Sequence, residues 1–183
     1  KLVDLVLPEE KSDWFAFTME MPSEKKDTLQ ADTIVQEKKE KKNDKKGKKK
    51  PKVKGELLVI LNPITGDSVS FKNVTKFSMS KNGLLCSFVR IMGDSIDSVQ
   101  VSYYNTAKKY HEIVYNNPGF TENISVDDKG NQFAFTFSND TVKEKAFGLY
   151  YFNVSDNKLI SVVDTSFANL QSGWSVSKNG KIY

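Results

Sequence analysis

Ser80-Lys81-Asn82-Gly83 is a short turn sequence that returns twice in this chain, as Asp127-Asp128-Lys129-Gly130 and as Ser177-Lys178-Asn179-Gly180. Each copy follows a short run of strand-forming residues, and the final glycines lie 47 and 50 residues apart. Glycine supplies the positive φ angle of a tight hairpin at little steric cost. A repeat of roughly 50 residues with several short strands is typical of β-propeller blades.

A second turn signal keeps nearly the same spacing. In each unit an asparagine ends an apolar strand and opens a turn: Asn62 with Thr65-Gly66, Asn105 with Thr106, and Asn153 with Ser155. These asparagines lie 43 and 48 residues apart. Two turn signals that recur with nearly the same spacing indicate a repeated structural unit, because one recurring signal alone arises more easily by chance.

Between the turns, apolar and polar residues alternate as they do in half-buried strands. Two groups of alternating residues share a strand face: Phe133, Phe135 and Phe137, and Phe15, Phe17 and Met19. We expect the second unit to have strands at residues 76–80, 84–89, 99–104 and 110–115. We expect the third unit to have strands at residues 122–126, 132–137, 147–152 and 159–164.

A Lys-rich insertion at residues 22–54 interrupts the first unit. It has almost no large apolar residues after Val35, so it cannot bury enough surface to offset the entropy lost on ordering. Residues 14–19 before it and 56–61 after it have strand patterns. We therefore predict that the insertion is a long loop between two neighbouring strands.

Together these signals predict an all-β fold, namely a partial β-propeller of about three four-stranded antiparallel blades plus the start of a fourth. The predicted blades are residues 1–73, which include the insertion, residues 74–119 and residues 120–171, and the next blade starts within residues 172–183. Twelve Phe and seven Tyr agree with a strand-rich chain. Because a ring typically requires about four to eight blades, we expect this chain to be a piece of a larger protein.

Positive charge is concentrated in one stretch. Residues 37–54 contain eleven lysines against Glu37, Glu40 and Asp44, whereas the formal net charge of the whole chain is only +4. The stretch lacks the Arg forks and aromatic platforms of nucleic-acid-binding proteins, so we interpret it as a solvated loop and predict no nucleic-acid partner. Weak, salt-sensitive attraction to anionic surfaces stays open as an alternative.

Neither a disulfide nor a membrane span is predicted. Cys86 is the only cysteine, and no run approaches the roughly 18 apolar residues that cross a bilayer. Residues 1–7 lack the long apolar run and the cleavage site of an export signal, so we expect the chain either to start after any such signal or never to have had one.

We predict no catalytic residue in this chain. His111 is the only histidine and has no nucleophile or orienting acid at a recognisable spacing, so we assign it a structural or surface role. The stretch Gly173-Trp174-Ser175-Val176-Ser177 approaches the nucleophile-elbow pattern of hydrolases, but a serine replaces its second glycine. A strand followed by a turn fits this stretch better.

We also predict no metal and no cofactor. Asp127 and Asp128 lack the alternating oxygen ligands of a calcium loop, and a lysine follows them, so we interpret them as turn residues. Gly47-Lys48 lacks the first glycine of a phosphate-binding loop and the Ser or Thr after the lysine.

The order of these features resembles a known family. The residues that carry the resemblance are Gly55-Glu56-Leu57-Leu58-Val59-Ile60-Leu61-Asn62, Thr65-Gly66, Phe71-Lys72-Asn73-Val74-Thr75-Lys76-Phe77-Ser78-Met79-Ser80-Lys81-Asn82-Gly83, and Ser12-Asp13-Trp14-Phe15-Ala16-Phe17 ahead of the insertion. They are similar to the amino-terminal propeller of prolyl oligopeptidase family serine peptidases from Bacteroidetes-type bacteria. The similarity covers essentially the whole chain, and its specificity comes from the order of the motifs together with the insertion.

The resemblance implies a periplasmic or secreted two-domain enzyme that cleaves short peptides. Its Ser, Asp and His would lie in an α/β-hydrolase domain outside this chain. This chain would then be a non-catalytic segment that restricts the access of peptides, with the hydrolase domain and peptide substrates as partners. A non-enzymatic periplasmic propeller that serves as a protein-binding or sensor module stays open, because the two differ only beyond Tyr183.

Overall fold

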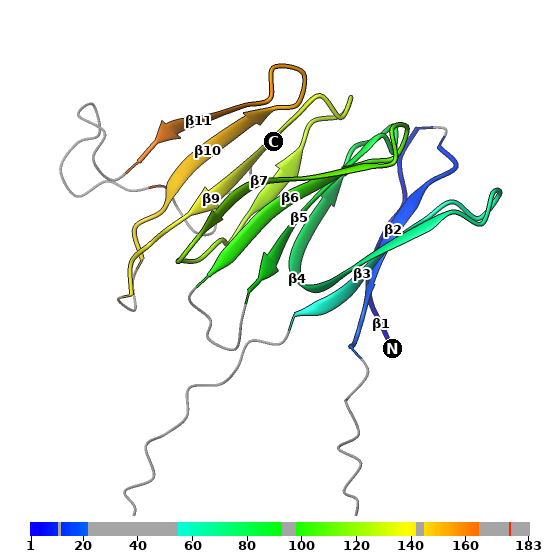
Figure 1. Ribbon diagram of the computed structural model, residues 1–183, viewed down its shortest axis with the longest axis horizontal. Helices are drawn as coiled ribbons and strands as arrows, with labels where there is room; N and C mark the ends of the chain where they lie inside the picture. Colours follow the sequence, from blue (N-terminus) through cyan, green and yellow to red (C-terminus); the bar gives the residue numbers. More distant parts are fainter. Residues whose placement is uncertain (11, 22–54, 93–97, 142–144, 165–175, 177–183) are drawn as a thin grey trace, which may run out of the picture.

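The computed structural model describes residues 1–10, 12–21, 55–92, 98–141, 145–164 and 176. These residues form strands and turns and contain no helix (Figure 1). A seven-stranded antiparallel sheet has the order β1 (Leu2–Val6), β2 (Phe15–Met19), β3 (Glu56–Leu61), β4 (Ser68–Met79), β5 (Leu85–Ile91), β6 (Val99–Asn105), β7 (Tyr110–Asn117). A four-stranded antiparallel sheet has the order β11 (Lys158–Val163), β10 (Gly148–Asn153), β9 (Gln132–Phe137), β8 (Ile124–Val126).

The all-β prediction is confirmed, and the two sheets together form a partial β-propeller that does not close. Seven of the eight strands expected in the second and third units appear within about two residues of their predicted bounds. The exception is the strand expected at residues 76–80, which is the second half of the longer strand β4. The blade limits near residues 73, 119 and 171 stay predictions, since the sheets do not divide at all of them.

The long strand β4 runs across the limit near residue 73 that the sequence predicts between the first and second units. Its first half pairs with β3, with Leu61 opposite Ser68, and its second half pairs with β5, with Met79 opposite Cys86. Between the halves, Asn73 has a φ angle of 61°, and both ladders shift register near Val74. Asparagine tolerates this left-handed conformation better than most residues, so the strand turns there without ending.

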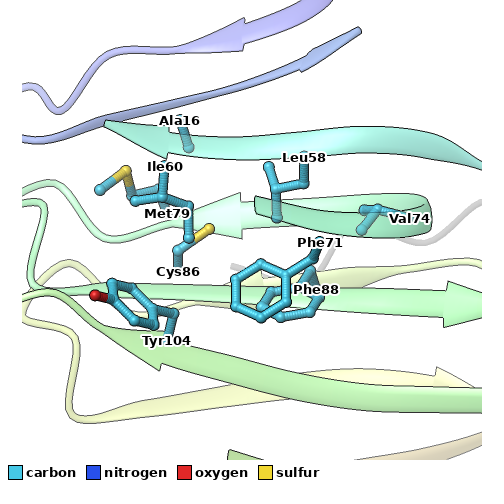
Figure 2. Close-up of a cluster of buried hydrophobic side chains, with 9 residues drawn as sticks. All are labelled: Ala16, Leu58, Ile60, Phe71, Val74, Met79, Cys86, Phe88 and Tyr104. Atoms are coloured by element: carbon cyan, nitrogen blue, oxygen red, sulfur yellow. The ribbon is translucent and has the colours of Figure 1, made fainter. Parts of the chain in front are cut away.

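The turn at β4 allows the seven-stranded sheet to pack back on itself. One buried cluster contains Ala16, Leu58, Ile60, Phe71, Val74, Met79, Cys86, Phe88 and Tyr104. Figure 2 shows Ala16 and Ile60, from β2 and β3, on one side of this cluster and Phe88 and Tyr104 on the other. Phe88 is fully buried, and burial of such a ring contributes about 1.5–3 kcal/mol.

A second buried cluster joins the two sheets. Its members are Leu85, Val89, Val99, Val101 and Tyr103 from β5 and β6, together with Phe133, Phe135, Phe137 and Phe152 from β9 and β10. The predicted shared face of the three β9 phenylalanines is therefore confirmed. That face points at the seven-stranded sheet.

The predicted glycine turns have the expected backbone. Gly83 and Gly130 both have a φ angle of 69°. The N–H of Gly83 donates to the carbonyl of Ser80 at 2.9 Å, and the N–H of Gly130 donates to the carbonyl of Asp127 at 3.2 Å. The third copy, at residues 177–180, lies outside the described residues.

The asparagine turns also repeat in detail. The Oδ1 atom of Asn62 accepts the N–H groups of Ile64 and Thr65 at 3.0 and 3.1 Å, and that of Asn153 accepts those of Ser155 and Asp156 at 2.9 and 3.0 Å. In the turn after Asn105, the Oδ1 atom of Asn105 accepts the N–H of Lys108 at 2.9 Å. The residue four positions after each asparagine has a positive φ angle: Gly66, Lys109 and Asn157.

We expect Gly130→Val to destabilise the protein by about 1–3 kcal/mol, whereas Lys129→Ala should change stability by less than about 0.5 kcal/mol. Valine at position 130 would place a β-branched residue in a left-handed backbone conformation. Its Cβ would lie only 3.0 Å from the Cβ of Leu85. Urea unfolding of both variants and the parent measures the contrast. Equal midpoints for the two variants would contradict it.

We expect deletion of residues 37–54 to leave the fold intact. The insertion connects β2 to its direct neighbour β3, whose ladder holds Met19 opposite Leu57, and loop length adds closure entropy only logarithmically. Far-ultraviolet circular dichroism and thermal melts of the deletion should match the parent within about 0.5 kcal/mol. A large loss of stability would show that the lysines pack or pair within the fold.

Candidate functional site

His111 lies on β7 and packs against two aromatic rings of the first cluster. Its ring centroid is 4.8 Å from that of Phe71 and 5.8 Å from that of Phe88, and the rings of His111 and Phe88 are nearly parallel at 13°. The Nε2 atom is buried and has no hydrogen-bond partner. Burial, and secondarily the positive charge of Arg90, lower the pKa of His111. This environment favours a neutral, packed imidazole, in keeping with the structural role predicted for it.

The two aspartates of the second glycine turn are engaged within the protein. Oδ1 of Asp127 accepts the N–H groups of Asn131 and Gln132 at 2.8 and 3.0 Å. Oδ2 of Asp128 lies 3.3 Å from the Nζ atom of Lys81. Across the described part of the chain, no group of three or more His, Cys, Asp and Glu side chains is placed to hold a metal ion. The geometry therefore agrees with the interpretation of both residues as turn residues.

Lys81 lies at the centre of a row of turns. Its Nζ atom contacts Glu9 at 3.2 Å on one side and Asp128 on the other, and both contacts raise the pKa of Lys81. The backbone carbonyl of Lys81 accepts the N–H of Glu10 at 2.9 Å. The side-chain amide of Asn82 donates to the carbonyl of Lys129, also at 2.9 Å. Exposed ion pairs of this kind add little stability.

A cavity of about 510 Å³ opens at the opposite ends of the strands, where β7 meets β9 and β10. Its lining residues are Tyr115, Asn117, Pro118, Phe137, Ser138, Asn139, Ala146, Gly148, Tyr150 and Asp164. The Tyr115 ring lies 4.9 Å from that of Phe137 and 5.4 Å from that of Tyr150, between ring centroids. Burial and the nearby Tyr150 raise the pKa of Tyr115 to about 12.

The lining of this cavity combines flat aromatic walls with amide, hydroxyl and carboxylate groups. Such a lining can contact a ligand through both apolar surface and hydrogen bonds. The cavity is the candidate functional site of the described residues. No sequence motif marks its residues as a site, because they come from separate segments that only the packing of β7 on the four-stranded sheet brings together.

Cys86 is buried in the first cluster, and burial raises the pKa of its thiol, which suppresses the reactive thiolate. Gly47-Lys48 and most of residues 173–177 lie outside the described residues. Val176 forms an isolated antiparallel bridge with Phe147, as expected of a residue in a strand.

Comparison with known proteins supports the fold. No family model and no curated protein matches the sequence. The β-propeller domain of the Trilobed protease from Pyrococcus furiosus is similar in structure, with a TM-score of 0.55 and 11% identity over 88% of this chain and 42% of that chain. A prolyl endopeptidase structure gives a TM-score of 0.53 at 10% identity, over 89% of this chain and 21% of its own.

An acylaminoacyl peptidase in complex with Z-Gly-Gly-Phe-chloromethyl ketone is also similar, with a TM-score of 0.50 and 9% identity over 86% of this chain and 24% of that chain. The chain thus spans less than half the length of each of these structures. At these identities the likeness establishes the class of fold, a partial β-propeller. None of the described residues belongs to a helix that could cross a membrane.

We expect the stability of the parent to fall more steeply than that of His111→Phe as the pH decreases from about 7 to about 5.5. The folded state holds the pKa of His111 below its ordinary value near 6.5, so the unfolded chain takes up a proton in this range before the folded chain does. Urea midpoints measured across the range test this difference. Parallel pH profiles for the parent and the variant would contradict it.

Proposed function

We propose that this chain is the non-catalytic propeller segment of a serine peptidase similar to prolyl oligopeptidases, and that it restricts the access of peptides to a hydrolase domain of the same protein. The observation that carries the proposal is the likeness of its fold to the propeller domain of one protease and to structures of two further peptidases. In the acylaminoacyl peptidase and prolyl endopeptidase structures, most of the other chain lies outside the matched region, which leaves room for a catalytic domain. The resemblance in the motif order and the Lys-rich insertion points the same way.

The described residues suit a role in access rather than in bond cleavage. The one histidine is packed against phenylalanine rings, and the one cysteine is buried. By contrast, the cavity beside Tyr115 and Tyr150 offers polar and aromatic contacts to a passing peptide. The protein that contains this chain would act in the periplasm or outside the cell, where short peptides are its substrates. Nucleic acid has no part in this function.

We expect the purified 183-residue chain to show no turnover of proline-containing chromogenic peptides and no covalent labelling by an active-site serine probe. The natural polypeptide that contains it should be labelled and should cleave short peptides much faster than long unfolded chains of the same local sequence, because the propeller limits access by size.

Two results would overturn the proposal. Labelling or turnover by the 183-residue chain above a heat-killed control would show that it has catalytic groups of its own. Absence of peptidase activity from the whole polypeptide would instead favour the non-enzymatic binding module.

A further inference from the structure

The cavity between β7 and the four-stranded sheet has a negative charge in its lining. Among the described residues that line it, Asp164 alone is charged. Its Oδ2 atom accepts the hydroxyl of Ser161 at 3.3 Å. A carboxylate accepts about four hydrogen bonds, and its charge acts on the cavity whichever of them are made. The cavity therefore favours a positively charged group.

Three aromatic rings of the lining meet at steep angles. The ring plane of Phe137 lies 72° from that of Tyr115 and 82° from that of Tyr150, with centroids 4.9 and 6.1 Å apart. The planes of Tyr115 and Tyr150 differ by 43°. Rings in these arrangements do not cover one another's faces as a parallel stack does. A ring face carries negative potential and attracts a cation within about 6 Å of its centroid, so the rings add to the attraction of the carboxylate.

Neighbouring side chains hold these rings in place before any ligand binds. Tyr150 stacks on the buried ring of Phe135, with centroids 5.4 Å apart and planes within 13° of each other. The Tyr115 ring lies at the same distance from Phe135. The rings come from paired strands of the two sheets, namely β7, β9 and β10. A site that is already ordered loses little conformational entropy on binding.

The chain itself places one ammonium group on an aromatic ring beside this cavity. The Nζ atom of Lys145 lies 4.2 Å from the centroid of the Phe120 ring. Phe120 forms a bridge with Ser138, which lines the cavity, as does Ala146, the residue after Lys145. Contact between a lysine side chain and a ring face therefore already occurs at this end of the strands.

We propose that the cavity binds the cationic end of a lysine or arginine side chain of a peptide. The ammonium or guanidinium group would lie near Asp164 and the ring faces, and the aliphatic part of the side chain would contact the rings. The cavity volume of about 510 Å³ lies within the roughly 300–1,000 Å³ of ligand pockets. The inference rests on the proposed function only in taking a peptide as the source of the cation.

Other classes of ligand suit the lining less well. An anion would be repelled by the carboxylate of Asp164 and by the ring faces. A purely apolar side chain would bury the carboxylate without a partner of opposite charge, which costs free energy. An organic cation with an aliphatic stem matches both the charge and the rings.

Side-chain analogues test the proposal with no peptide bond to cleave. The cations n-butylammonium and n-propylguanidinium represent lysine and arginine, and n-butanol and n-propylurea are their neutral matches. Dissociation constants are measured by ligand-observed NMR titration of the natural polypeptide that contains this chain. We expect each cation to bind at least about fivefold more tightly than its neutral match. N-acetyl-lysine N-methylamide should bind at least as tightly as n-butylammonium.

Asp164→Asn tests whether the cavity is the site, because an asparagine oxygen can still accept the Ser161 hydroxyl. It should weaken the binding of both cations about threefold or more, and that of the neutral matches less than about twofold. Asp156→Asn is the matched control, since it removes the same charge from the exposed turn at the other end of β10. Tyr150→Leu should also weaken cation binding, with folding checked by circular dichroism.

Equal affinities for the cations and their neutral matches would overturn the proposal. Equal losses in Asp164→Asn and Asp156→Asn would also overturn it, because the attraction would then come from the overall charge of the protein. Binding of n-butylammonium without binding of the blocked lysine would rule out a peptide side chain as the ligand. None of these readouts uses catalysis, so peptidase activity without a preference for cations would reject this inference and leave the proposed function standing.

Discussion

The structure depends on one kind of contact, in which a strand face with aromatic side chains packs on an aliphatic face. Phe88 packs in this way with Leu58 and Ile60, and Phe133 and Phe135 pack with Leu85 and Val89. Each strand is too short to bury its apolar residues alone, so the sheets are stable only when they face one another. The ladders within the sheets set which residues share a face, and the packing between faces holds the two sheets together.

The turns at one end of the strands support this packing. Lys81 contacts the turns on both sides of its own, and Asn82 binds the backbone of the next turn. These exposed contacts contribute little free energy, so the packing of the strand faces, rather than the contacts themselves, sets how the turns lie. The left-handed residues Gly83 and Gly130 keep each hairpin tight enough for the turns to lie side by side. The opposite strand ends have different chemistry and contain the cavity beside Tyr115.

This division between the two ends bears on function. The row of turns is held together by its own polar groups, whereas the cavity presents hydroxyl, amide and carboxylate groups between aromatic walls. A rigid array of blades with a polar and aromatic opening can select ligands by size and shape without any reactive group. The access role proposed above for this chain rests on that property.

The sequence by itself determined the all-β class, the positions of most strands and the two families of turns. These features follow from local rules, since a two-residue alternation defines a strand face and the backbone of a tight turn selects glycine or asparagine. It also indicated that His111, Asp127 and Asp128 have no reactive neighbours along the chain. Only the tertiary structure decided that β4 runs through Asn73 to join seven strands in one sheet, because that depends on pairing with β3 and β5 at once. The same holds for the cavity, whose residues Tyr115, Phe137 and Tyr150 are distant in sequence and meet only where the two sheets pack together.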